Sequence, residues 1–153
     1  MELSDLYSEK ILDLVANAPQ PGRLVDPDAS VRKSSRICGS VIEVDIAVRD
    51  GIISGYGQKV SACALGQTSA AIVAREAIGT PVPEFRALRD QVHAMLKAEG
   101  APPSGRWDDL RFLEPVRAFP NRHASTLLVF DAVVDALDQA EAKQRRADEA
   151  VAG

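Results

Sequence analysis

An Asp50-Gly51 dipeptide between two apolar-rich segments constrains the fold more than any other feature of this sequence. Asp-Gly is typical of two-residue type I′ turns, in which both central residues need positive φ. Before it, Cys38 to Val48 carries apolar residues that alternate with Glu43 and Asp45, the pattern of a half-buried strand. The chain then returns through Ile52 to Val60. The sequence therefore predicts an antiparallel hairpin with one buried face.

This hairpin relates the two cysteines of the chain to each other. Cys38 lies twelve residues before Asp50, and Cys63 lies twelve residues after Gly51. A regular ladder would place the two side chains opposite one another, about 5 Å apart on one face. Gly55 and Gly57 in the return strand indicate a bulge or a close backbone approach. A bulge would shift the register by one residue and turn one side chain to the other face.

Helical patterns surround the hairpin. The first helix is predicted from Leu3 to Asn17, with Ser4 as its cap. The later ones are a small-faced buried helix over 64–78, a second over 83–98, a short helix or turn over 107–116 and a long helix over 121–143. The expected fold class is α+β: a small antiparallel sheet packed against several helices. We expect a single domain over residues 1–143 and a frayed, charged C-terminal tail over 144–153.

Charge and hydropathy exclude several classes of function. The net charge is −4, and acids are interleaved with the basic residues, so no basic stripe for nucleic acid is present. No apolar run approaches the roughly 20 residues that span a bilayer. The first residues lack a basic segment followed by an apolar stretch, so we expect no signal peptide and a cytoplasmic protein.

Cys38, Cys63 and His123 are the candidate ligand residues. Cys63 is expected just before a helix and His123 in the first turn of the last helix. Zinc and iron both accept thiolate and imidazole ligands. The residues alone leave another interpretation open, in which both cysteines are small core side chains and His123 is a capping or surface residue. His93, within a helical pattern, receives no role.

Short segments along most of the chain carry a resemblance to a known family. They are Leu6-Tyr7-Ser8-Glu9-Lys10-Ile11-Leu12-Asp13, Asp26-Pro27-Asp28-Ala29, Ile37-Cys38-Gly39-Ser40-Val41-Ile42, Ala62-Cys63-Ala64-Leu65-Gly66-Gln67-Thr68-Ser69-Ala70 and Pro120-Asn121-Arg122-His123-Ala124-Ser125. In order and spacing they resemble the U-type iron–sulfur cluster scaffolds, which comprise the NifU N-terminal domain, IscU and SufU. The segment between Pro83 and Val116 is longer than in IscU and resembles the insertion of the SufU branch.

The resemblance implies a ligand set and partners. Family members assemble an iron–sulfur cluster or hold zinc on three cysteines plus an aspartate or histidine. They take sulfur from a cysteine desulfurase and pass the product to apoprotein clients. By position, Cys38 and Cys63 match the first two cysteines, and His123 matches the histidine that precedes the third. Ser40 stands where the family has its aspartate, and Ala124 where it has the third cysteine.

The implied function is that of a scaffold-like carrier of iron, a cluster or zinc rather than an enzyme, with any sulfur transfer passing through a cysteine persulfide. Two chains in a homodimer would together supply four cysteines, the number that holds common clusters. An alternative is a non-metal interaction module that docks a desulfurase or a client. A hydrolase or transferase with Cys63 as nucleophile and His123 as base lacks an orienting carboxylate at any matching position.

Overall fold

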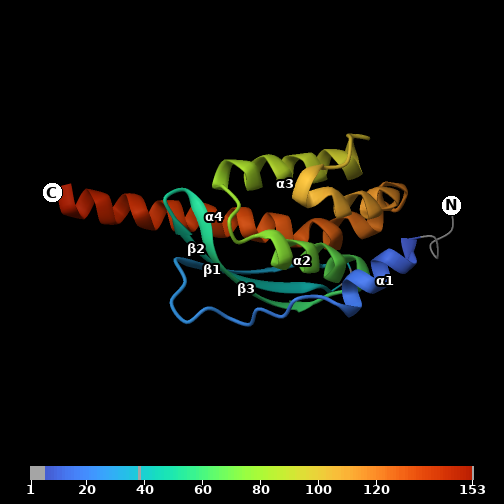
Figure 1. Ribbon diagram of the computed structural model, residues 1–153, viewed down its shortest axis with the longest axis horizontal. Helices are drawn as coiled ribbons and strands as arrows, with labels where there is room; N and C mark the ends of the chain where they lie inside the picture. Colours follow the sequence, from blue (N-terminus) through green and yellow to red (C-terminus); the bar gives the residue numbers. More distant parts are fainter. Residues whose placement is uncertain (1–5, 38, 153) are drawn as a thin grey trace.

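The computed structural model of the protein describes residues 6–37 and 39–152, and it confirms the α+β class (Figure 1). Three strands form an antiparallel sheet in the order β1-β2-β3. They are β1 (Ala29–Ser34), β2 (Val41–Arg49) and β3 (Ile52–Ser61). The helices are α1 (Glu9–Ala16), α2 (Ala64–Glu76), α3 (Val82–Lys97), the 3₁₀ segments η2 (Gly105–Ala118) and η3 (Pro120–Arg122), and α4 (His123–Ala152).

The predicted hairpin is confirmed, and so is a bulge in its return strand. Asp50 and Gly51 have φ of 54° and 74°, as a type I′ turn requires. Arg49 pairs with Ile52, and Val48 with Ile53, but Ala47 pairs with Gly55, which leaves Ser54 as the extra residue. The regular register that we expected to place Cys38 opposite Cys63 is therefore wrong beyond this point.

Strand β1 was not predicted. Its six residues carry only two apolar side chains, Ala29 and Val31, and their alternation with polar residues is too short to stand out. Ala29 pairs with Ile46 and Val31 with Val44, so both side chains share the inner face of β2. Lys33, on the same face, forms an ion pair with Asp135 of α4. Contacts distant in sequence thus define this strand.

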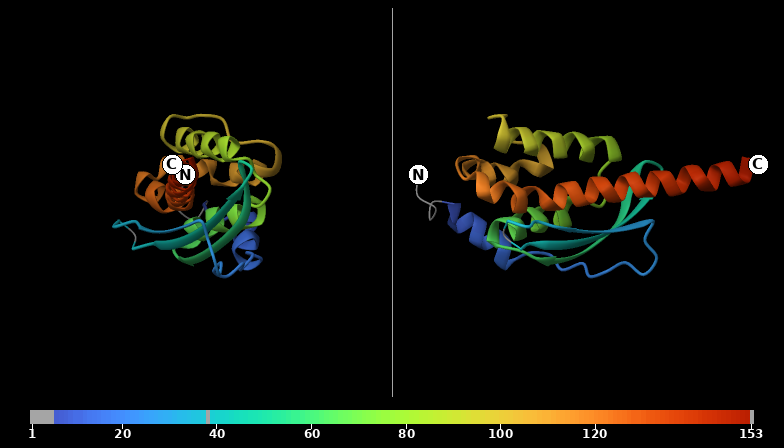
Figure 2. Two further views of the ribbon diagram at one scale, coloured as in Figure 1. Left: turned by 90° about the vertical axis from the view of Figure 1, so that its left-hand side faces the viewer. Right: turned by 180° about the vertical axis from the view of Figure 1, so that it is seen from behind.

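One face of the sheet packs against helices. Ile42, Val44 and Ile46 alternate into the core, as the strand pattern predicted. Helices α2 and α4 cover this inner face, and α3 with η2 lies on the far side of them (Figures 1 and 2). In that outer layer Phe85 meets the Trp107 ring edge-on at 5.8 Å and the Phe130 ring stacked at 6.3 Å, measured between ring centroids.

Several helix ends differ from those predicted. Helix α1 begins at Glu9, with the Ser8 Oγ accepting from the Ile11 N–H at 3.3 Å; the predicted start at Leu3 and cap at Ser4 lie outside the described residues. Helix α2 ends two residues early, at Glu76. Helix α4 continues past Lys143 to Ala152, and Figures 1 and 2 show its end projecting beyond the domain. Fraying of this exposed segment stays a prediction.

The outer face of the sheet is covered in part by the chain between α1 and β1. Asp45 points to this face and is only 1% exposed, and Arg23 binds its carboxylate with two hydrogen bonds of 2.6 and 2.8 Å. Ser30 Oγ and the Leu24 N–H also donate to it. These bonds, that of Arg23 first, lower the pKa of Asp45 to about 2. The carboxylate thereby anchors the loop to the sheet.

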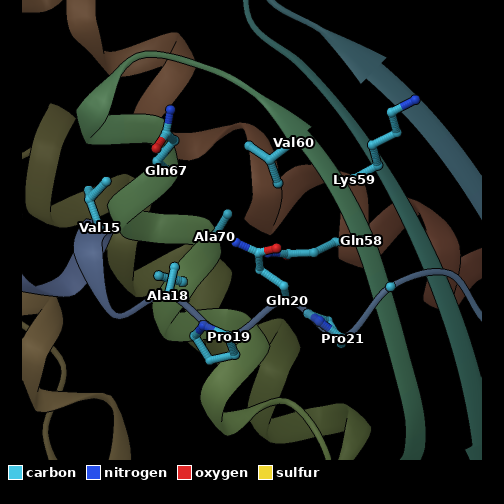
Figure 3. A pocket seen from close by; sticks show the side chains of 12 residues that line it. Val15, Ala18, Pro19, Gln20, Pro21, Gln58, Lys59, Val60, Gln67 and Ala70 are labelled. Atoms are coloured by element: carbon cyan, nitrogen blue, oxygen red, sulfur yellow. The ribbon is translucent and has the colours of Figure 1, made fainter.

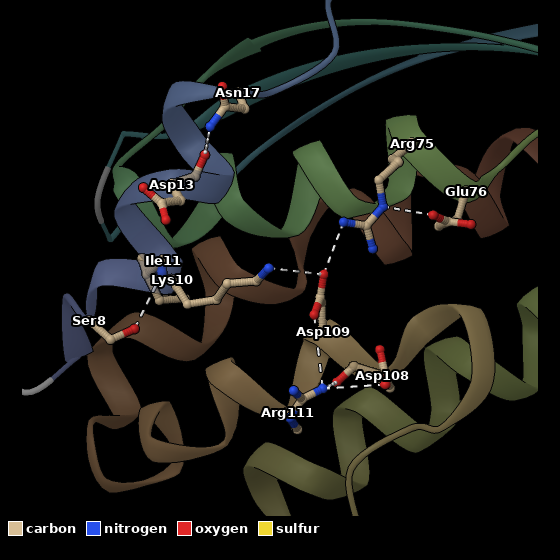
Figure 4. Close-up of polar contacts among 10 residues, drawn as sticks. All are labelled: Ser8, Lys10, Ile11, Asp13, Asn17, Arg75, Glu76, Asp108, Asp109 and Arg111. Carbon is tan, nitrogen blue, oxygen red and sulfur yellow. Dashed lines mark hydrogen bonds and ion pairs between the residues drawn. The ribbon is translucent and has the colours of Figure 1, made fainter.

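A second polar network joins the helices. Asp109 of η2 accepts from Arg75 of α2 at 3.0 Å and lies 3.9 Å from Lys10 of α1 (Figure 4). Arg111 of η2 also lies 3.9 Å from Asp109. Asp109 is 15% exposed, so these three cations neutralise a largely covered carboxylate. In the part of the chain that the structure describes, no helix is both long and apolar enough to cross a bilayer.

Candidate functional site

Cys63 lies at the junction between the sheet and α2. It lies two residues beyond Ser61, the last residue of the ladder, and has φ −65° and ψ 170°. It occupies the N-cap position of α2 without a capping hydrogen bond from its side chain. The side chain is half-buried and packs against the core cluster. The predicted position just before a helix is therefore confirmed.

The thiol of Cys63 meets the first turn of α4. Its Sγ lies 3.3 Å from the Oγ of Ser125, which is 1% exposed. The Ser125 hydroxyl also lies within hydrogen-bond distance, 3.3 Å, of the Arg122 carbonyl oxygen, to which it donates. Ser125 has a single hydroxyl proton, so it can donate either to the carbonyl or to the sulfur, and in the first case it accepts from the thiol. The Ser125 hydroxyl can therefore accept a hydrogen bond from the Cys63 thiol or donate one to the Cys63 thiolate.

A glycine makes this approach of two helices possible. At Gly66 an added Cβ would lie 2.9 Å from the Ala62 Cβ and 3.1 Å from the carbonyl oxygen of Ser125. Any larger residue would separate the start of α2 from the start of α4. The buried hydroxyl of Thr68 donates to the Ala64 carbonyl oxygen, so this polar atom is satisfied within α2. The small-faced helix predicted here is thus what brings Cys63 to Ser125.

His123 is held by backbone carbonyls at the start of α4. It is 6% exposed, and its Nε2 lies 3.0 Å from the Val116 oxygen and 3.3 Å from the Arg117 oxygen. Both partners only accept, so Nε2 carries the proton and donates. In the neutral ring, Nδ1 is then the nitrogen with a lone pair. Metal-bound histidines commonly donate their other N–H to a carbonyl in this way.

The remaining candidate, Cys38, lies outside the described residues. Among the described residues on either side of it, the Ser35 N–H donates to the Ser40 oxygen at 2.8 Å and the Gly39 N–H donates to the Ser35 oxygen at 2.9 Å. The ladder between β2 and β3 ends at Val41 and Ser61, with the register shifted by one. The expected contact between Cys38 and Cys63 is therefore not supported by strand pairing and stays a prediction.

The donor atoms fit a metal or cluster only in part. Within residues 6–37 and 39–152, no three or more histidine, cysteine, aspartate or glutamate side chains gather as a metal site would require. Cys63 and the Nδ1 of His123 are the described donors, and Ala124 between His123 and Ser125 offers none. Ser40 is 2% exposed. A complete ligand set needs Cys38 or groups from outside this chain.

Ser125 is the residue of this site that the sequence interpretation missed. It lies one residue beyond Ala124, and nothing in its sequence environment distinguishes it from other serines. Only the packing of α2 on α4 shows that its hydroxyl faces Cys63. His93, which received no role, lies elsewhere, with its Nε2 2.8 Å from an Asp131 carboxylate oxygen that also binds Arg89.

Comparison with known proteins gives matches among solved structures. A scan against family models and a search of curated proteins both find no match. The crystal structure of a nitrogen-fixing NifU-like protein (N-terminal) from Brucella abortus is 44% identical in sequence and superposes with a TM-score of 0.89. The match covers 92% of this chain and 98% of that chain.

Two more distant structures share the fold. A protein proposed as an iron–sulfur cluster assembly scaffold of the SUF system, from the thermophile Fervidobacterium islandicum AW-1, is 18% identical with a TM-score of 0.79, covering 89% of this chain and 99% of that one. A hypothetical protein is 22% identical with a TM-score of 0.77, again covering 89% and 99%. At these identities the likeness concerns the fold alone.

Proposed function

Because the chain belongs to the U-type iron–sulfur cluster scaffold family, in its NifU-like branch, we propose that it is a scaffold-like protein of iron–sulfur cluster assembly. Its cargo would be iron, a cluster or zinc, held through Cys63 together with Cys38 and His123. The observation that supports this most is the position of Cys63. A half-buried thiol at the start of α2, beside the first turn of α4, is accessible to cargo and yet fixed by packing.

The ligand count favours a labile or shared site. Cys63, His123 through Nδ1, and Cys38 would give three ligands, which leaves a coordination position for water or for a partner's side chain. Two chains in a homodimer would bring four cysteines together, enough for a common cluster. With Ala124 at the third-cysteine position, Cys38, Cys63 and His123 supply at most three ligands from one chain.

Sulfur delivery would follow thiol exchange chemistry. The Cys63 thiolate would attack the outer sulfur of a persulfide on a cysteine desulfurase, forming a new S–S bond as the old one breaks. The desulfurase cysteine leaves as a thiolate and the sulfur remains on Cys63 as a persulfide. Apoprotein clients would then receive the assembled product. In this proposal the protein carries cargo and does not turn over a substrate.

Metal and acid-labile sulfide analysis tests the proposal directly. The wild-type protein and the Cys38→Ser/Cys63→Ser double variant would be purified without oxygen, with Ser61→Ala as a matched control near the site. We expect iron with sulfide, or zinc, near one equivalent per site in the wild type and the control, and none in the double variant. Equal metal content in all three proteins would refute a role for the cysteines.

A second candidate function is an interaction module without metal. Two observations favour it: Ala124 replaces a ligand, and the described residues contain no three-ligand cluster. The surface would then dock a desulfurase or a client while the thiols play no part. Titration of the desulfurase with wild-type and double-variant protein separates the two functions. Full affinity and full cellular function of a metal-free double variant would favour the module.

A further inference from the structure

A pocket of about 480 Å³ opens on the side of the domain, between the end of α1, the following loop, β3 and α2 (Figure 3). Its volume lies within the usual range of ligand sites. Its apolar wall includes Val15, Pro19, Val60 and Ala70. A second hollow of about 360 Å³ shares Pro19 and Ala71 with it but is separate, and we call the first pocket alone the groove.

The free edge of the sheet faces this groove. The N–H of Gln58 donates to the Gly22 oxygen at 3.0 Å, outside the ladder with β2, so the backbone of Gln58 faces outward. Residues two apart in a strand direct their backbone groups to the same side, and Val60 therefore faces outward as well. In the described part of the chain no backbone hydrogen bond outside the ladder reaches the Val60 N–H. An unpaired strand edge is a template for another strand.

Gly22, which has a φ of 72°, lies directly against this edge of the sheet. At Gly57 an added Cβ would lie 2.5 Å from the Gly22 oxygen, so the loop approaches β3 as closely as a neighbouring chain would. After Gly22 the pairing stops, and towards Val60 the same edge borders the pocket instead. A strand arriving from outside would pair at Val60, the next outward-facing position after Gln58, where the Gly22 oxygen is bound.

Two glutamines on the walls offer complementary polar groups. The Oε1 of Gln58 accepts from the buried Tyr56 hydroxyl at 2.7 Å, which leaves its amide N–H groups as donors. The Nε2 of Gln67 donates to the Ala62 oxygen at 2.7 Å, which leaves its Oε1 as an acceptor. One donor and one acceptor match a peptide group, which has one of each. Among the described lining residues Lys59 is the only charged one, so a basic ligand is disfavoured.

We propose that this groove binds an extended segment of a partner protein, which adds as a strand to the free edge of β3 beside Val60. An apolar side chain of the segment fills the pocket against Ala70, and an acidic residue lies beside Lys59. Peptides bind to other sheet edges in this mode, with backbone bonds for affinity and pockets for specificity. Val60 lies three residues before Cys63, so the bound segment ends next to the cysteine site. The groove needs no metal or sulfur on Cys63, and its test is independent of that function.

The probes are capped synthetic pentapeptides that alternate threonine with valine, leucine or phenylalanine, each made with a terminal aspartate or a terminal lysine. Amide chemical shifts of the ¹⁵N-labelled protein report binding at millimolar peptide concentration. We expect shifts at Lys59, Val60 and Ala70, and about two- to fivefold tighter binding of the aspartate peptides. No shift at these residues with any peptide of the panel overturns the proposal.

Two variants separate strand addition from non-specific contact. Val60→Pro removes the outward N–H without touching the ladder with β2, and Val60→Thr keeps both the N–H and the branched shape. Binding should weaken about three- to tenfold in Val60→Pro and stay near wild type in Val60→Thr. Peptides N-methylated at the backbone should lose affinity to a similar extent. Equal affinity across these proteins and peptides overturns strand addition.

The charge preference and the occupant are tested separately. Lys59→Glu should reverse the preference, so that lysine peptides bind more tightly than aspartate peptides; an unchanged preference overturns the acidic partner. Analytical ultracentrifugation without peptide tests the other occupant of a strand edge. A dimer that Val60→Pro dissociates would show that a second copy of this chain fills the groove, and this overturns the proposed partner.

Discussion

Replacing Asp45 by asparagine should destabilise the fold by about 2 kcal/mol at neutral pH. The carboxylate is 1% exposed and accepts from Arg23, Ser30 and the Leu24 N–H, which together hold its pKa at about 2 against an ordinary value of 3.8. Asparagine keeps the shape but loses the charge and offers one acceptor oxygen instead of two. The half-exposed Arg23 is screened by solvent, which limits the loss.

The same pKa sets a pH window. A carboxyl whose pKa is lower in the folded state stabilises the fold fully above its unfolded pKa, and this stabilisation is lost as the pH falls through the folded pKa. For Asp45 it is complete above about pH 5, roughly halved near pH 3 and nearly gone at pH 2. The difference in free energy of unfolding between the wild type and Asp45→Asn should therefore decrease as the pH falls from 5 to 2.

Urea denaturation followed by circular dichroism at pH 7 and pH 3 measures both effects. Glu43→Gln is the matched control, because Glu43 lies on the same face of β2 and also binds Arg23, at 3.2 Å, but is 30% exposed. We expect it to change the free energy of unfolding by less than about 0.5 kcal/mol. If Asp45→Asn cost the same at both pH values, or no more than Glu43→Gln, the anchoring role of the buried carboxylate would be refuted.

Three further changes test the site and the packing. Ala124→Cys adds a thiolate in the turn that touches Cys63 and should raise the amount of bound metal per chain several-fold, as measured by elemental analysis. Ala147→Cys, in the exposed end of α4, should not raise it, and equal gains in the two variants would contradict the site. Gly66→Ala should lower the free energy of unfolding, measured in urea, by about 1 kcal/mol, because the cost of crowding Ala62 and Ser125 exceeds the gain in helix propensity. A stabilised variant would mean that α2 and α4 separate easily. Deleting residues 144–153 should change the free energy of unfolding by less than about 0.5 kcal/mol. In the full-length protein the backbone amides of this segment should exchange with little protection, and slow exchange would count against fraying.

Strong local signals were sufficient for much of the fold. The Asp50-Gly51 turn, the alternation over β2 and the apolar face of α3 each depend on neighbours in sequence, so the sequence alone predicted them. The positions of Cys63 and His123 at helix starts followed from the same kind of pattern. Local chemistry was enough wherever a turn, a strand period or a helix face fixed the conformation.

Tertiary structure decided the rest. Ser54 is bulged out of the ladder, and one extra residue in a strand changes every pairing beyond it, which no periodicity can show. Strand β1 has too few apolar residues to be recognised and is defined by its pairing with β2. The contact between Cys63 and Ser125 joins residues far apart in sequence and exists because Gly66 lets two helices meet. The sequence by itself thus determined which side chains can act as metal ligands or accept sulfur, and packing between distant segments determined which of them are in contact.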